Sequence, residues 1–182
     1  MNVINFKSKQ RGTFSIEFSL IAIAFSMLLV FSGDVIIKLA VKGKLDRLSF
    51  SLVSIVKERT QLYGEDYSIR AAETNAIYQI AENSLQRTMQ SYTASDFGAL
   101  IEEQTFDNSG AANAAVRFYV GTLRCNVNDF LSQLTHVSVV TSWGRQASLY
   151  RVTLCYDTDN WFGAAVGERF TRVNSSSIMI GR

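Results

Sequence analysis

An uncharged apolar run near the N-terminus limits most strongly what this chain can fold into. From Phe18 to Phe31 the sequence is FSLIAIAFSMLLVF, and a weakly polar stretch around it extends from Thr13 to Gly33. At about 1.5 Å per residue, a helix of this length spans roughly 31 Å, close to the hydrocarbon thickness of a bilayer. Because the run is apolar on every side, we expect a membrane-crossing helix rather than the core helix of a globular domain.

Composition indicates one folded domain behind this run. Of the 182 residues, 47% are apolar and 19% are charged, which excludes an intrinsically disordered protein, and the lack of proline permits long helices. The net charge of +2 comes from Lys7, Lys9 and Arg11, since 15 basic and 16 acidic side chains remain from residue 13 onward. This balance gives no support to nucleic-acid binding, which needs a basic face.

The residues at the start of the run, KQRGTFSIEFSL, form a distinct pattern. Gly12 follows the basic leader, and Glu17 is the fifth residue after that glycine. A carboxylate at the lipid boundary costs on the order of a few kcal/mol unless it is paired or reaches the headgroups. Snorkelling to the headgroups is one explanation of Glu17. Pairing is the other, because a cut between Gly12 and Thr13 creates an amine four residues away on the same helix surface.

Basic leader, glycine, glutamate and unbroken apolar helix together resemble a type IV prepilin or pseudopilin signal. A prepilin peptidase cuts such a signal on the cytoplasmic side after the glycine. The resemblance implies cleavage between Gly12 and Thr13, with Glu17 and the aromatic Phe18 in the assembly segment. It also implies a single-pass protein of the bacterial inner membrane, with a cytoplasmic N-terminus and a periplasmic C-terminal domain. A mature chain that begins with Thr13 departs from the commoner type IV pattern, which begins with an aromatic residue, and this leaves N-methylation open.

The likeness extends beyond the anchor. RGTFSIEFSLIAIAFSMLLVF, the following DVIIKLAVKGKLDRLSFSLVSIVKERTQLY, the length and the ending SSSIMIGR resemble the TadF pseudopilins of the tight adherence pilus system, with TadE proteins as the nearest alternative. The resemblance implies a minor subunit for assembly of Flp-type pili, and not an enzyme. A major pilin of that system is much shorter, so the exported domain argues against a bulk filament subunit. The implied partners are a prepilin peptidase, other Tad pilins and pseudopilins, assembly platform proteins and membrane lipid, without nucleic acid or cofactor. Whether the subunit stays in the membrane or enters the pilus is left open.

Two other hypotheses explain part of the same sequence. An ordinary signal peptide also has a basic start and an apolar core, and a cut before Gly33 would release a soluble periplasmic domain. The chain is otherwise a membrane-anchored or secreted periplasmic binding domain unrelated to pili. A mature N-terminus at Thr13 separates the pilin-like hypothesis from both.

The pattern predicts a basic leader at 1–12, a transmembrane segment at 13–33, a periplasmic continuation of the helix at 34–64 and an α+β domain at 65–182. Beyond Gly33, apolar residues recur at helical steps, which favours a helix that docks one stripe on its own sheet over a coiled-coil seam. The stripe consists of Val41, Leu45, Leu48, Leu52, Ile55 and Leu62.

A second helix is predicted over 68–90, capped by Ser68, and it is followed by short strands of an antiparallel sheet. The apolar stripe of this helix contains Ile69, Ala72, Ala76, Ile80, Leu85 and Met89, and the strands are expected at 100–106, 115–120, 137–143, 148–156 and 177–180. Residues 142–146 are expected to form a hairpin turn, and 163–167 a loop.

Cys125 and Cys155 lie in the exported part, where an oxidising compartment favours a disulfide over two free buried thiols. Asp157, Asp159 and Glu168 match the first, third and twelfth positions of an EF-hand loop, but Trp161 and Phe162 stand where a ligand and the turn glycine belong. We therefore expect a strand-ending turn at 157–160 and leave a divalent ion there as an open question.

Overall fold

The computed structural model describes residues 11–62 and 68–181, so the leader up to residue 10 lies outside the described residues. The chain divides into two compact units. The first contains the described residues up to Lys38 together with Asp159–Phe170, and the second contains Leu39–Thr158 and the chain from Thr171 onward.

A single long helix, α1, occupies Arg11–Leu62 and confirms the helix that the sequence predicts. Proline is absent from it, so no backbone donor is missing along its length. Its apolar part is long enough to cross a bilayer and is almost entirely unburied, whereas a core helix of a globular domain would be mostly covered. The helix is therefore a candidate membrane anchor; the residue limits 13–33 of the span remain a prediction.

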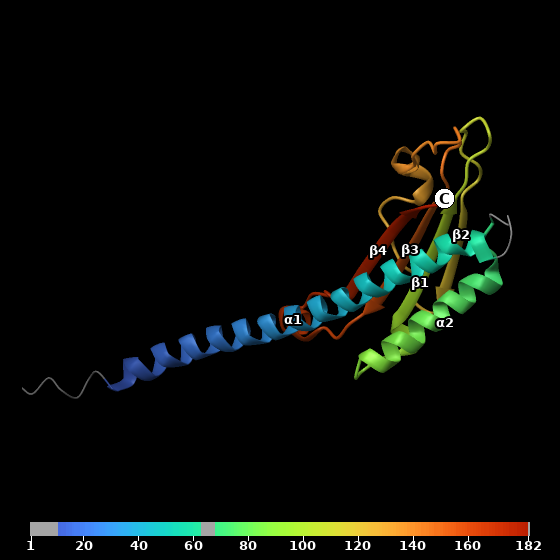
Figure 1. Ribbon diagram of the computed structural model, residues 1–182. Helices are drawn as coiled ribbons and strands as arrows, with labels where there is room; N and C mark the ends of the chain where they lie inside the picture. The colour runs from blue at the N-terminus through green and yellow to red at the C-terminus, as the bar shows by residue number, and fades with distance from the viewer. Residues whose placement is uncertain (1–10, 63–67, 182) are drawn as a thin grey trace, which may run out of the picture. The chain divides into compact units, whose positions relative to one another are not determined.

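The second unit is an α+β fold with one antiparallel sheet, as the sequence predicts. Its strands are β1 Phe97–Gln104, β2 Val116–Gly121, β3 Leu149–Asp157 and β4 Arg172–Ile180, in the order β2-β1-β3-β4. Every neighbouring pair is antiparallel, and Ile101 of β1 lies opposite Val152 of β3. Helix α2, Ala71–Thr88, and the part of α1 after Leu39 cover one face of the sheet (Figure 1).

The core lies between these helices and the sheet, which confirms that α1 docks on its own sheet. Leu45 and Leu52 of the predicted stripe are fully buried there. Ile55, however, is exposed, and Val53 and Val56 are buried in its place. A helix has 3.6 residues per turn, so a stripe that faces the sheet winds slowly around the helix. The buried position therefore moves from Ile55 to the next residue, Val56. The side chain of Leu62 lies outside the described set.

Helix α2 differs from the prediction at its start and on its buried face. Its N-cap is Arg70 rather than Ser68, and the Glu73 carboxylate accepts the Arg70 backbone N–H at 3.1 Å. Tyr78 is buried and its ring stacks on Phe97 with centroids 5.2 Å apart. This large ring fixes the rotation of the helix and leaves the smaller predicted stripe partly in solvent: Ala72, Ala76 and Ile80 are exposed.

The strand predicted at 137–143 is wrong. A short 3-10 helix covers Thr135–Val137, and only an isolated bridge joins Val140 to Gln146. The turn between them is present, since the Thr141 N–H donates to the Arg145 carbonyl at 2.8 Å and Gly144 has φ +74°. Val140 is exposed, and a β-branched residue favours a strand mainly when it packs on neighbouring strands. Here no adjacent strand among the described residues extends the pairing.

Candidate functional site

The predicted processing site lies at the very start of α1. The helix begins at Arg11, so the bond between Gly12 and Thr13 is in its first turn, where backbone N–H groups have no acceptor inside the helix. The first turn contains no acidic residue. Glu17 follows one turn after Thr13 and is exposed. The helix therefore places these two residues on one face, four positions apart.

An apolar surface surrounds Glu17 and continues along the helix. Phe18 is exposed and its ring stacks on that of Phe14, with centroids 6.3 Å apart. A surface helix of a globular domain would bury one apolar face, and a large apolar surface without cover marks contact with a membrane or a partner. The large apolar side chains in this part are 43 to 73% exposed: Phe14, Ile16, Phe18, Leu20, Ile21, Ile23, Phe25, Met27, Leu28, Leu29, Val30 and Phe31.

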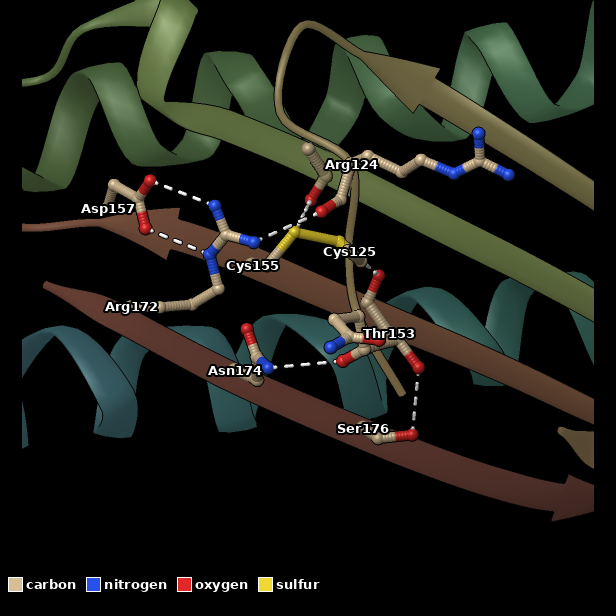
Figure 2. Close-up of a disulfide and its surroundings, with 10 residues drawn as sticks. Arg124, Cys125, Thr153, Cys155, Asp157, Arg172, Asn174 and Ser176 are labelled. Atoms are coloured by element: carbon tan, nitrogen blue, oxygen red, sulfur yellow. Dashed lines mark hydrogen bonds and ion pairs between the residues drawn. A yellow bond between two sulfur atoms is a disulfide. The ribbon is translucent and has the colours of Figure 1, made fainter. Parts of the chain in front are cut away.

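A disulfide joins Cys125 to Cys155, which confirms the predicted pairing. Both cysteines are buried on the face of the sheet opposite the helices, where they pack with Leu100. Cys155 lies on β3 and Cys125 in the chain that follows β2, so the bond fixes this connecting segment to the sheet (Figure 2). The cross-link closes a separation of 30 residues.

Hydrogen bonds from β4 hold the same segment. The Arg172 guanidinium donates to the Arg124 carbonyl at 3.4 Å, and the Asn174 side-chain amide donates to the Asn126 carbonyl at 3.3 Å (Figure 2). Arg172 also donates to both carboxylate oxygens of Asp157, each at 3.0 Å. These bonds, partly opposed by desolvation, raise the pKa of Arg172 above its ordinary value. The segment is thus tied to two strands.

The pairing of Asp157 with Arg172 bears on the metal question. Its two oxygens already have a cationic partner, which weakens it as a cation ligand. In the chain between residues 11 and 62 and between 68 and 181, no three His, Cys, Asp or Glu side chains lie close enough together to hold a metal ion. β3 ends at Asp157, but the predicted turn at 157–160 is not formed, because the Thr158 N–H still donates to the Thr171 carbonyl at 2.9 Å. Asp159 and Glu168 belong to the first unit.

Sequence reasoning missed a buried ion pair on the face that carries the disulfide. Glu102 of β1 is fully buried and pairs with Arg151, its register partner on β3. The pair also holds the segment between β2 and β3: Arg151 donates to the Asp129 carbonyl at 2.8 Å, and the Leu131 N–H donates to Glu102 at 3.2 Å. The single arginine inside the apolar strand LYRVTLCYD indicates that a buried ion pair is present. Its partner, Glu102, depends on the register of β1 and β3 and cannot be found from the sequence.

The predicted loop at 163–167 is also wrong, because residues Trp161–Val166 form a short helix, α3, in the first unit. Gly167 ends it in the left-handed conformation at φ +79°, which suits glycine. The Phe162 ring meets the Phe31 ring of α1 edge to face, with centroids 4.9 Å apart. The segment 159–170 therefore packs on α1 near the end of the predicted span.

A hollow of about 820 Å³ lies in the second unit, beside the turns at 107–111 and 141–145. Phe106, Asp107, Trp143 and Arg145 contribute to its lining, which combines aromatic rings with charges of both signs. The hypothesis of a periplasmic binding domain can be tested there with small ligands.

Comparison with known families finds a match over nearly the whole chain. A family model described as putative tight adherence pilin protein F matches residues 5–182. No curated protein and no solved structure matches the chain. The matched range includes the start of α1, the apolar segment and the whole disulfide-bonded domain, so the similarity is not confined to the anchor.

Proposed function

The chain belongs to the tight adherence pilin protein F (TadF) family, and we propose that it is a minor pilin-like subunit that supports assembly of a Flp-type pilus. The observation that carries the proposal is the uncovered apolar half of α1, which begins with one carboxylate, Glu17, and is followed by a disulfide-bonded domain. The uncovered surface is suited first to lipid and then to the other Tad pilins and pseudopilins. We infer a structural role rather than catalysis.

We propose that a prepilin peptidase cuts between Gly12 and Thr13. A peptidase needs the bond in an accessible, unwound form, and the first turn of a helix opens at little cost because its N–H groups make no bonds within the helix. The basic leader before the cut carries Lys7, Lys9 and Arg11. We expect it to stay on the cytoplasmic side because it resembles an export signal with a foldable domain behind it.

After this cut, the new Thr13 amine is a positive charge at the positive end of the helix dipole, beside an apolar surface. Glu17 lies one turn further on the same face, and its carboxylate compensates that charge. We propose that it pairs with the amine of its own or of a neighbouring subunit during assembly, so that neither charge stays alone among apolar groups. Phe18, exposed next to Glu17, then packs against neighbouring subunits or the assembly platform.

The disulfide supports the proposed orientation. A bridge such as Cys125–Cys155 forms and persists in an oxidising compartment, which for a bacterial membrane protein is the periplasmic side. We therefore place the domain in the periplasm and the N-terminus in the cytoplasm, with α1 crossing the inner membrane once.

The assembly role of Glu17 is tested in cells that lack the protein and carry it on a plasmid. Glu17→Gln keeps the shape but removes the charge, and leaving the amine unpaired in apolar surroundings costs on the order of 3 to 5 kcal/mol. We expect surface pili to fall at least about tenfold, because 1.4 kcal/mol already corresponds to that factor. Glu17→Asp should restore part of the pili, and Glu58→Gln, in the same helix, should leave them unchanged.

Two further readouts keep the result interpretable. The amount of protein in the membrane and the N-terminal residue of each variant separate failed assembly from failed folding or failed cutting. Wild-type numbers of pili in cells that carry Glu17→Gln would show that the carboxylate has no role in assembly.

A further inference from the structure

The segment 159–170 lies against α1 at the end of the predicted membrane span. Phe162 contacts Phe31, which is two residues before Gly33, the predicted last residue of the span. Both elements belong to the same compact unit. If α1 crosses a bilayer over 13–33, the contact places α3 at the level where acyl chains give way to headgroups.

The side chains that this segment leaves uncovered are those that favour that level. Trp161 is 56% exposed, Phe170 is 54% exposed, and Val166 is also exposed. Tryptophan in particular is enriched at membrane–water interfaces, because its ring is apolar and its N–H needs a polar partner. The apolar surface of α1 continues past the contact point with Ile36 and Leu39, which are exposed as well.

The backbone of the segment has its own hydrogen-bond partners. The Asn160 side chain donates to the Glu168 carbonyl at 2.7 Å and accepts the Phe170 N–H at 3.1 Å, while its backbone carbonyl accepts the Ala164 N–H at 3.0 Å. The Glu168 N–H donates to the Gly163 carbonyl at 2.9 Å. Because these hydrogen bonds pair the backbone groups at both ends of the short helix, few unpaired polar groups would enter the lipid, where each one costs free energy.

Glycine at position 163 is part of this closed form. A Cβ there would meet the Asn160 side-chain oxygen at 2.1 Å and the Glu168 carbonyl at 2.5 Å. The charged residues of the segment are Asp159 at its start and Glu168 and Arg169 just before its last residue, Phe170, and all three are exposed. An apolar middle between polar ends suits a segment that lies in the membrane surface rather than across the bilayer.

We propose that residues 159–170 are a membrane-interface segment that inserts Trp161, Val166 and Phe170 into the headgroup region of a phospholipid bilayer, on the side of the folded domain. The inference rests on the proposed membrane span of α1. The segment fixes the depth of the helix, because it holds Phe31 at the interface and leaves the residues from Thr13 to Phe31 for the hydrocarbon.

The two tryptophans of the chain allow a direct test in the full-length protein reconstituted into phosphatidylcholine and phosphatidylglycerol vesicles. The Trp143→Phe variant reports on Trp161 alone. The Trp161→Phe variant reports on Trp143, which is 87% exposed and belongs to the second unit. Lipids brominated near the headgroup end of the acyl chain quench only tryptophans that reach the interface.

We expect Trp161 to emit at shorter wavelength than in water and to be quenched by the brominated lipid far more than Trp143. Trp143 should emit as in water and respond to acrylamide instead. Flotation of the vesicles is measured on the same samples, so failure of the span itself appears as protein that does not float with lipid.

Three results with floating protein would overturn the inference. Unquenched Trp161 with emission as in water would leave the segment in solvent. A short-wavelength but unquenched emission would mean that protein, such as a second copy of the chain, covers it. Equal quenching of both tryptophans would indicate that the whole domain adsorbs to lipid.

Discussion

The two halves of α1 are both helical, but they differ in how far the rest of the chain buries their side chains. From Phe14 to Phe31 almost every side chain is exposed, although nearly all are apolar. From Val41 to Val56 one stripe is buried against the sheet and α2, and charged residues such as Lys42 and Asp46 occupy the other faces. Both halves form helix, so helix formation does not show which half stabilises the domain. Side-chain burial shows it.

This difference assigns a separate task to each half. The second half contributes to a core that the chain builds by itself, and its substitutions should change the free energy of unfolding. Apart from the contact of Phe31 with Phe162, the first half is left exposed by the described chain, so we expect its substitutions to change insertion or assembly instead.

The largest effect should come from the same substitution made in both halves. Leu52 is fully buried, and Leu52→Ala leaves a cavity that should lower the free energy of unfolding by roughly 3 to 5 kcal/mol. Leu28→Ala, where the leucine is 58% exposed, should lower it by less than about 0.5 kcal/mol. Denaturant unfolding of the detergent-solubilised chain, followed by near-ultraviolet circular dichroism, measures both. Equal losses would contradict the division.

Removing the disulfide sharpens the comparison, because the bond acts only in the second unit. The Cys125→Ala, Cys155→Ala double variant should lose roughly 3 to 4 kcal/mol of domain stability, since its unfolded chain gains the freedom of a loop closed over 30 residues. Flotation with vesicles should be unchanged. A stable domain without the bridge would show that the ion pair and hydrogen bonds hold the segment unaided.

A smaller effect should separate a buried serine of α1 from an exposed one. The Ser49 hydroxyl lies 3.0 Å from that of Ser175 and 2.8 Å from that of Ser177, in the contact between α1 and β4. Ser49→Ala leaves those groups without this partner and should cost roughly 1 to 3 kcal/mol. Ser51 is exposed, so Ser51→Ala is the matched control and should be neutral within about 0.5 kcal/mol in the same unfolding assay.

The smallest effect belongs to a turn that is wholly in water. The Ser109 hydroxyl and the Ala111 and Ser109 N–H groups donate to Asp107 and lower its pKa below the ordinary 3.8. Because the pKa of Asp107 is lower in the folded chain than in the unfolded chain, the ionised carboxylate stabilises the fold above pH 3.8. This stabilisation is lost as the pH falls through the pKa of the folded chain. An NMR titration should place the Asp107 inflection below 3.8, and Ser109→Ala should move it upward. If the Asp107 inflection stayed at its ordinary value in both the native chain and the Ser109→Ala variant, the hydrogen bonds of this turn would be absent in solution.

The predictable parts of the fold follow from local pattern. The length of α1 follows from its apolar run, its helical stripe and the absence of proline, and the disulfide from two cysteines in an exported domain. What failed depends on partners far along the chain. Val140 has strand propensity but no adjacent strand, and Glu102 meets Arg151 only through the register of β1 and β3. Residues Trp161–Val166 form a helix where the spacing of Gly163 and Gly167 predicts a loop.

The candidate site divides in the same way. The order of Gly12, Thr13 and Glu17 is visible in the sequence, and the helical spacing that puts the last two on one face follows from simple geometry. The contact of Phe162 with Phe31 was not predictable, because it joins residues on either side of the whole second helix and three strands.

The most direct measurement of the central claim is the intact mass and N-terminal sequence of the protein purified from the membranes of cells that make it. We predict a chain that begins with Thr13, and we predict that Gly12→Leu keeps the leader while Gly33→Ala, whose added methyl group meets no atom within 4 Å, is cut normally. A protein that keeps Met1, or one that begins at Gly33, would contradict the account.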